Sequence, residues 1–319
     1  MLAAAFVLAV QSCYQDIDLQ RYRKAPTLVL NSIVSPDTVV MASVGKTVFF
    51  TEYREGCETV NDATVSLYVD GKFKETMPLD RGAGMYMSGY RPMAGESVDI
   101  KATSPDGIVA GHCIVPDVVP IESVRVSCRV YEDPDVKVWI NNERQNLRRC
   151  EVTYHIAFSD EPAKENYYCI RIEDAQLHIS LDNIDYSHDD VFLAQQTAVD
   201  AAKPSGKIEG REGRTFSDEL FDGKRYELKI VETIALYDYP DLEQRDRRII
   251  VYALSPEYYK YLTGILNEDE SSLSGSLIKF GFAEPRQHYS NIQGGTGIVG
   301  GVQSATSEID VASAIRAKI

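Results

Sequence analysis

The residues with the most readily named chemistry lie near the start of the chain, where an apolar stretch leads to a cysteine. Residues 2–10 are apolar, and they are followed by Gln11, Ser12 and Cys13. A short apolar segment, a small residue and then a cysteine is typical of a cleaved signal whose cysteine thiol accepts a lipid. We therefore expect residues 1–12 to be a lipoprotein signal peptide and Cys13 to be lipidated. An ordinary secretory signal beside an unmodified cysteine is the alternative.

A lipidated cysteine would hold the protein at a membrane. Each buried methylene of an acyl chain contributes about 0.8 kcal/mol, so two or three chains anchor a protein to a bilayer. The apolar stretch is too short for a spanning helix, which needs about twenty residues. Residues 13–26 would form a tether, and its segment Tyr14-Gln15-Asp16-Ile17-Asp18 partly resembles the acidic export signal of surface lipoproteins in the Bacteroidota. We expect attachment to the outer membrane, with export to the cell surface as a hypothesis and a solvated acidic tether as its alternative.

The richest set of oxygen ligands lies in the loop over residues 182–190. Its carboxylates are Asp182, Asp185, Asp189 and Asp190. Calcium prefers hard oxygen ligands of this kind. The spacing does not fit an EF-hand, because Ile184 occupies a position that needs an oxygen and the required glycine is missing. A solvated loop is the favoured interpretation, and a calcium site is the alternative.

Five cysteines remain once Cys13 is set aside: Cys57, Cys113, Cys128, Cys150 and Cys169. No pair has the spacing of a zinc ribbon. Because the number is odd, at least one thiol stays free even in a compartment that permits disulfides. Cys128 and Cys150 lie on the apolar side of their predicted strands, so we expect them to be small buried hydrophobic residues. A disulfide between these two is the alternative.

The sequence carries no recognised catalytic signature. It has no Gly-Xaa-Ser-Xaa-Gly elbow, no phosphate loop, no dinucleotide fingerprint and no His-Glu-Xaa-Xaa-His motif. The net charge of −15 would repel the phosphates of a nucleic acid. We therefore expect no catalytic residues, no metal, no nucleic-acid partner and no cofactor other than a lipid on Cys13.

The elements that must position these residues are mostly strands. In the first part of the chain, alternating apolar residues predict strands over 27–34, 39–52, 64–69, 72–77, 84–89, 97–103 and 108–115. Asp70-Gly71 is a two-residue hairpin signal, and residues 104–107 predict a second turn. Short strands with such turns favour a β-sandwich of immunoglobulin or transthyretin type over residues 27–118.

Residues 119–319 predict a second β-rich domain. Strands are expected over residues 124–131, 152–158, 167–172, 175–180, 225–236 and 248–253. Ser255-Pro256-Glu257 combines a capping residue, a proline at the first helical position and an early acid, which predicts one helix of about three turns. The glycines over 294–301 lack the lysine of a phosphate loop, so we expect flexible backbone there.

Three segments taken together resemble one family. They are Phe158 to Pro162 with Asn166-Tyr167-Tyr168, then Ser255 to Tyr261, and then Glu284-Pro285 with Tyr289 to Ile292 and the glycines that follow. In order and spacing they resemble the Bacteroidota lipoproteins grouped as domain of unknown function 4249. The matched positions are Asp160, Pro162, Asn166, Tyr167, Tyr168, Tyr258, Tyr259, Glu284, Pro285, Ser290, Asn291 and Gly295. Because these residue types are common in turns, we expect their roles to be structural.

The resemblance implies an outer-membrane lipoprotein, of a kind often encoded beside TonB-dependent receptors, with no catalytic residues to carry over. We therefore expect a non-enzymatic accessory that captures a ligand for such a receptor or closes over it. Its partners would be a TonB-dependent outer-membrane receptor and the membrane itself. An adhesion or structural module of the cell envelope is the alternative, and a hydrolase assembled from distant carboxylates is a third hypothesis.

Overall fold

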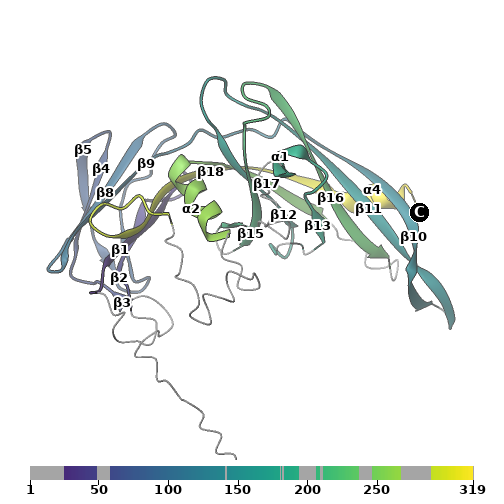
Figure 1. Ribbon diagram of the computed structural model, residues 1–319, viewed down its shortest axis with the longest axis horizontal. Helices are drawn as coiled ribbons and strands as arrows, with labels where there is room; N and C mark the ends of the chain where they lie inside the picture. The colour runs from purple at the N-terminus through teal and green to yellow at the C-terminus, as the bar shows by residue number, and fades with distance from the viewer. Residues whose placement is uncertain are drawn as a thin grey trace, which may run out of the picture.

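The computed structural model describes residues 25–48, 58–140, 142–179, 181, 183–193, 206–208, 211–236, 246–266 and 289–318. The signal peptide, Cys13 and most of the tether lie outside the described residues, so the lipid anchor stays a prediction. The described part is mainly β, as the sequence predicts, and contains three sheets and three short helices (Figure 1).

The N-terminal part is a β-sandwich, as predicted. One layer is a sheet in the order β5-β4-β8-β9, formed by β4 (Thr64–Val69), β5 (Lys72–Met77), β8 (Ser97–Ser104) and β9 (Gly107–Ile114). The other layer contains β1 (Leu28–Val34), β2 (Met41–Lys46), β3 (Glu58–Thr59), β6 (Leu79–Asp80) and β7 (Met85–Met87). Alternate residues of the longer strands are buried between the layers, so the period-two pattern builds the core. Asp70 and Gly71 have φ values of 50° and 72°, which confirms the predicted hairpin turn.

The C-terminal part also has two layers. One is the sheet β10-β11-β16-β13, formed by β10 (Ser123–Ile140), β11 (Glu143–Ser159), β13 (Ile184–Asp185) and β16 (Arg225–Leu236). The other contains β12 (Tyr167–Asp174), β14 (Gly206–Ile208), β15 (Arg211–Ser217) and β17 (Asp246–Leu254). Their shared core includes Tyr154 and Phe158 of β11, Ile170 of β12 and Val251 of β17, all fully buried. Apolar residues on one side of each long strand therefore hold the two layers together.

Residues 175–180 differ from the sequence prediction. Residues 175–177 form a turn, because Asp174 Oδ1 accepts hydrogen bonds from Gln176 N at 3.0 Å and from Leu177 N at 2.9 Å. An aspartate that binds backbone donors two and three residues later favours a turn over a strand. The strand predicted over 175–180 is therefore wrong.

One strand near the end of the chain joins the two parts. The first residues of β18 (Thr296–Asp310) pair in parallel with β1, and residues 302–310 pair antiparallel with β17. The larger sheet therefore runs through both parts in the order β14-β15-β12-β17-β18-β1-β2-β7-β6, with β3 on β2. The glycine segment was predicted to be flexible, but most of it forms the start of β18. Its glycines allow a close approach to β1, because a Cβ at Gly297 would lie 2.2 Å from Leu30 O. The domain boundary at residue 118 stays a prediction.

The predicted helix is confirmed as α2 (Pro256–Leu266), which packs on β18. Ser255 Oγ accepts hydrogen bonds from Tyr258 N at 3.3 Å and from Gly301 N at 3.0 Å, so one side chain caps the helix and fastens it to the sheet. The other helices are α1 (Asp190–Leu193) and α4 (Val311–Arg316). Within the described ranges, no helix has the length and apolar character needed to cross a membrane.

Four of the five remaining cysteines fall in the described part, and all four carry free thiols. Cys150 is buried, as expected, and Cys128, for which burial was also expected, is partly buried. Cys113 and Cys169 are buried as well. Cys128 and Cys150 both pack into the core of the C-terminal part, and the alternative disulfide between them is not formed. Cys57 lies outside the described residues.

Candidate functional site

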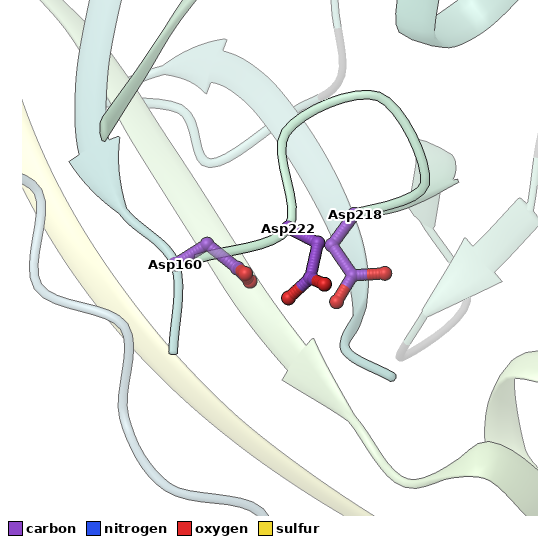
Figure 2. Close-up of side chains that lie close together, drawn as sticks. All are labelled: Asp160, Asp218 and Asp222. Atoms are coloured by element: carbon purple, nitrogen blue, oxygen red, sulfur yellow. The ribbon is translucent and has the colours of Figure 1, made fainter. Parts of the chain in front are cut away.

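Two turns meet at one end of the C-terminal part. Residues 160–166 connect β11 to β12, and residues 218–224 connect β15 to β16. They bring three carboxylates together, and one oxygen of each of Asp160, Asp218 and Asp222 lies within 4.8 Å of the others. Figure 2 shows the three side chains converging, with Asp222 between the other two. This is the carboxylate cluster.

Asp160 is almost fully buried and ties the two turns to each other. Its Oδ1 accepts a hydrogen bond from the Tyr168 hydroxyl, and its Oδ2 accepts one from Gly223 N at 2.7 Å. Gly223 has a φ of +66°, and a Cβ there would lie 2.7 Å from the Cβ of Pro162. Only glycine fits this contact without strain, so Pro162 and Gly223 set how closely the turns approach.

Asp218 is the second buried carboxylate, with 6% of its surface exposed. Its Oδ2 accepts a hydrogen bond from Asn166 N at 2.7 Å, and its own N–H donates to Asn166 O at 3.1 Å. The Asn166 side chain donates to the carbonyl oxygens of Glu161 and Lys164 at 3.0 and 2.9 Å. Asn166 therefore orders its own turn and holds Asp218 beside it.

The cluster is electrostatically strained. Burial raises the pKa of Asp218, the hydrogen bonds from Asn166 oppose that shift, and the negative charges of Asp160 and Asp222 add to it. Asp222 is exposed, and its Oδ1 accepts a long hydrogen bond from Ala163 N at 3.3 Å. A positively charged group placed between Asp218 and Asp222 would relieve the repulsion between the carboxylates.

A pair of tyrosines forms a wall beside the cluster. The rings of Tyr167, at the start of β12, and Tyr259, on α2, stack with centroids 4.4 Å apart and planes 22° apart. The Tyr167 hydroxyl donates to Glu165 Oε2 at 2.8 Å. Burial, this hydrogen bond and the charge of Glu165 raise the pKa of Tyr167 to about 12, so the hydroxyl stays protonated at neutral pH.

Tyr167 and Tyr259 line a common cavity of about 570 Å³ with two carboxylates of the cluster, those of Asp218 and Asp222. It is lined by Ala163, Lys164, Glu165, Tyr167, Ser217, Asp218, Glu219, Asp222 and Tyr259. Small-molecule sites usually have volumes of about 300–1,000 Å³ and combine aromatic walls with a few polar groups. Four carboxylates and one ammonium group line this cavity, so its charge favours a cation or a ligand rich in hydrogen-bond donors.

Beneath the cavity, aromatic side chains hold the two turns in place. Phe158, Tyr168, Phe216 and Phe221 pack with ring centroids between 5.2 and 6.3 Å apart. Edge and tilted contacts of this kind each contribute about 0.5–1.5 kcal/mol beyond burial. The backbone on which the cavity is built is therefore well supported.

The residues of the family resemblance fall into two groups. Asp160, Pro162, Asn166, Tyr167, Tyr168 and Tyr259 lie at or beside the cavity, as described above. Ser290, Asn291 and Gly295 lie in the segment before β18 instead, and Tyr258 lies on α2, which packs on β18. Asn291 Nδ2 donates to His112 O at 2.8 Å and to Val299 O at 2.7 Å, so it links the sandwich to β18. Glu284 and Pro285 lie outside the described residues.

The contacts in this second group are local and structural. Ser290 Oγ accepts a hydrogen bond from Ile292 N at 3.2 Å. A Cβ at Gly295 would lie 2.4 Å from Leu28 O, so the chain approaches β1 too closely for any side chain. Tyr258 is buried against Gly300, where an added Cβ would lie 2.7 Å from the Tyr258 Cβ.

Two carboxylates of the acidic loop considered for calcium, those of Asp185 and Asp189, have partners within the chain. Asp189 is buried, and it accepts hydrogen bonds from the Tyr226 hydroxyl at 2.7 Å and from Lys229 N at 2.8 Å. Asp185 accepts from Ser187 N at 2.8 Å and lies 3.2 Å from His188 Nε2. Asp190 is exposed at the start of α1, and Asp182 lies outside the described residues. In the described chain, the group of three candidate ligands occurs in the carboxylate cluster instead.

Sequence reasoning missed Asp218 and Asp222. A local signal was present, because Ser217-Asp218-Glu219 and Asp222-Gly223 form an acidic turn before a strand. Nothing local, however, links this turn to Asp160. The link depends on β12 pairing with β15 and on β11 pairing with β16.

Comparisons with known proteins identify a family. A family model described as Domain of unknown function (DUF4249) matches residues 14–308. Comparison with curated proteins gave no match. Among solved structures, a "Putative membrane anchored protein" from Corynebacterium diphtheriae matches with a TM-score of 0.21 and 12% identity, over 72% of this chain and 55% of that chain. The chain thus spans about half the length of that protein, and a similarity this low carries no functional argument.

Proposed function

We propose a function from the premise that the chain belongs to the DUF4249 family, whose model matches residues 14–308. The protein is a non-enzymatic outer-membrane lipoprotein, anchored through Cys13, that captures a ligand as the accessory of a TonB-dependent transporter. The observation that carries the ligand-capture part is the cavity between the stacked Tyr167 and Tyr259 and the carboxylates of Asp218 and Asp222.

The chemistry of the cavity favours a small cationic ligand, such as an organic amine. A positive charge is attracted to the face of a tyrosine ring, and charge-assisted hydrogen bonds to carboxylates are stronger than neutral ones. Asp218 and Asp222 supply the carboxylates, and Tyr167 and Tyr259 supply the aromatic wall. The lining residues offer mainly acceptors, so a donor-rich ligand would satisfy them best.

Binding is a better fit than thiol-based catalysis for the described residues. Burial raises the pKa of Cys150 and of Cys169 to about 12, so neither thiol forms a thiolate at neutral pH. The pKa of Cys113 is also raised by burial, well above its usual range. Buried thiols of this kind pack as small apolar side chains.

The membrane and receptor parts of the proposal rest on sequence. The apolar residues 2–10 and Cys13 support a lipid anchor, and the family resemblance supports a TonB-dependent receptor as the partner. A tethered capture protein gains from its tether, because a ligand bound close to a receptor is presented at a high effective concentration.

One pull-down tests the partner. The lipidated full chain, purified from detergent-solubilised outer membrane, should bring down a TonB-dependent receptor, and Cys13→Ser should lose the membrane fraction altogether. Recovery of the lipidated chain without any such receptor would contradict the accessory function.

A second measurement tests the cavity. Thermal shift of the full chain against a panel of small amines, amino acids and sugars should identify binders, with Asp222→Asn or Tyr259→Ala weakening the binding at least about tenfold. Asp62→Asn is the matched control, because Asp62 is an exposed aspartate of the N-terminal sandwich. Equal binding by the wild type and both cavity variants would contradict capture at this site.

A further inference from the structure

The hairpin formed by β10 and β11 extends beyond the sheet to which it belongs. β11 pairs with β16 from Arg148 to Ser159, whereas β10 and β11 continue to pair with each other as far as Ile140 and Glu143. Residues 137–140 and 142–146 therefore have no third strand beside them among the residues that the structure describes. We call these residues the hairpin tip. Figure 1 shows it at the end of the molecule opposite the N-terminal sandwich.

An irregularity separates the tip from the supported part of the hairpin. The register shifts between Asp133, which lies opposite Leu147, and Lys137, which lies opposite Asn146. The extra residues on β10 include Pro134, which removes a backbone donor from the strand. A bulge of this kind bends the strand and increases its local twist, so the direction of the sheet does not fix the direction of the tip.

The tip carries an unusual combination of side chains. Trp139 is the single tryptophan of the chain, and 74% of its surface is exposed. Arg144 lies directly opposite it on β11, and the exposed Lys137 is two residues away on the same face of β10. Lys137 and Arg144 give the tip two cationic side chains against one carboxylate, Glu143, in a chain of net charge −15. Behind the tip, Glu132 lies opposite Arg148 and Asp133 pairs with Arg149.

We propose that the hairpin tip contacts an anionic lipid surface, with the Trp139 ring in the headgroup region and Lys137 and Arg144 beside lipid phosphates. Tryptophan is enriched at membrane–water interfaces because its apolar body and N–H group match that boundary. Each Lys or Arg near an anionic membrane contributes about 1 kcal/mol of attraction. The rest of this acidic chain would be repelled, so the basic tip is the part that approaches.

The size of the tip favours a lipid surface over a protein partner. A stable protein interface buries about 1,200–2,000 Å² in total, whereas one tryptophan buries about 150–250 Å². A tip two strands wide offers little more contact area than one tryptophan side chain. A weak contact is enough when the chain is already held at the bilayer, because tethering raises the effective concentration to the millimolar range. This last step rests on the proposed lipid anchor, but the contact itself does not.

The uniqueness of Trp139 makes the test direct, because all tryptophan fluorescence comes from the tip. The full chain carrying Cys13→Ser is mixed with vesicles of phosphatidylcholine and phosphatidylglycerol, or of phosphatidylcholine alone. We expect a shift of the emission maximum to shorter wavelength and quenching by brominated lipid with the anionic vesicles, and a smaller response with the neutral ones.

Sedimentation with the same vesicles compares variants. Trp139→Ala should lower the partition coefficient about tenfold or more, the factor expected for one large apolar side chain. Lys137→Gln and Arg144→Gln should each lower it about fivefold. Phe73→Ala is the matched control, because Phe73 is 58% exposed on β5 at the other end of the molecule, and it should leave partitioning unchanged.

Two results would overturn the proposal. One is an emission maximum that does not move with anionic vesicles, and the other is equal partitioning by Trp139→Ala and the wild type. A spectral shift seen only after addition of a solubilised outer-membrane protein would assign the tip to a protein partner instead. Because the assay uses the Cys13→Ser chain, its outcome is independent of acylation, which mass spectrometry of the lipidated chain tests separately.

Discussion

Glu232→Gln should destabilise the protein strongly, because it removes the main partner of a buried guanidinium. Arg247 Nη2 donates to Glu232 Oε1 at 2.9 Å, and Arg247 Nε donates to Glu232 Oε2 at 3.1 Å. The Tyr154 hydroxyl donates to the same carboxylate. The side chains of Arg247 and Glu232 are 2% and 1% exposed, so solvent cannot replace either partner.

Arg247 stays charged in the variant, because a guanidinium group is effectively always protonated in a protein. In the wild type, burial alone would lower the pKa of Arg247, but the hydrogen bonds and charge of Glu232 outweigh burial and raise it. Loss of one partner from a buried ion pair costs about 3–5 kcal/mol. Glutamine keeps one carbonyl acceptor, and Asp174 Oδ2 remains 3.4 Å from Arg247 Nη1, so we expect the lower end, about 3 kcal/mol.

Urea unfolding followed by far-ultraviolet circular dichroism measures this loss. Glu151→Gln is the matched control, because Glu151 pairs with Arg129, whose side chain is 69% exposed, and such pairs contribute at most about 1 kcal/mol. The double variant Glu232→Gln with Arg247→Met should recover part of the stability, because no unpaired charge remains. A Glu232→Gln variant no less stable than Glu151→Gln would refute the reasoning.

Three further outcomes are expected. Gly223→Ala should lower the melting temperature more than Gly95→Ala, because both have positive φ but only at Gly223 would the Cβ meet Pro162; equal losses would contradict this. The folded-state pKa of Asp218 is raised, so its contribution to stability is present below the unfolded pKa of about 4 and is lost as pH rises through the folded value. Asp218→Asn should therefore be more stable than the wild type at neutral pH, with the difference shrinking towards pH 3 in melting curves. Cys169, whose pKa burial raises to about 12, should resist iodoacetamide in the folded protein and react after unfolding, as mass spectrometry would show.

Features with local causes were predictable from the sequence. Asp70-Gly71 needs only its own positive φ values to make a hairpin turn, and Ser255-Pro256 needs only a cap and a fixed φ to start a helix. Alternation along β10 and β11 likewise predicts strands whose apolar sides pack against the core, fully buried on β11 and partly buried on β10. Each of these features depends on residues that are neighbours in sequence.

Features that depend on distant pairings were missed or misread. Asp160 and Asp218 meet only because two pairs of strands align their ends, and no pattern within either turn encodes that. The glycines before and within the first part of β18 give no alternation, because their role is to let backbone approach backbone at Leu28 and Leu30. Of the residues that line the cavity, the resemblance pointed to Tyr167 and Tyr259, and the structure added the acidic residues, among them Asp218 and Asp222.

The parallel pairing of β18 with β1 constrains how the protein can be made. About 260 residues separate Val34 from Thr296, so a ribosome adding about 5–20 residues per second leaves β1 without that neighbour for tens of seconds. During that interval the nascent sandwich lacks one neighbour of β1, and its edge is exposed to unwanted strand exchange. We therefore expect biosynthesis to depend on chaperones more for the N-terminal part than for the C-terminal part.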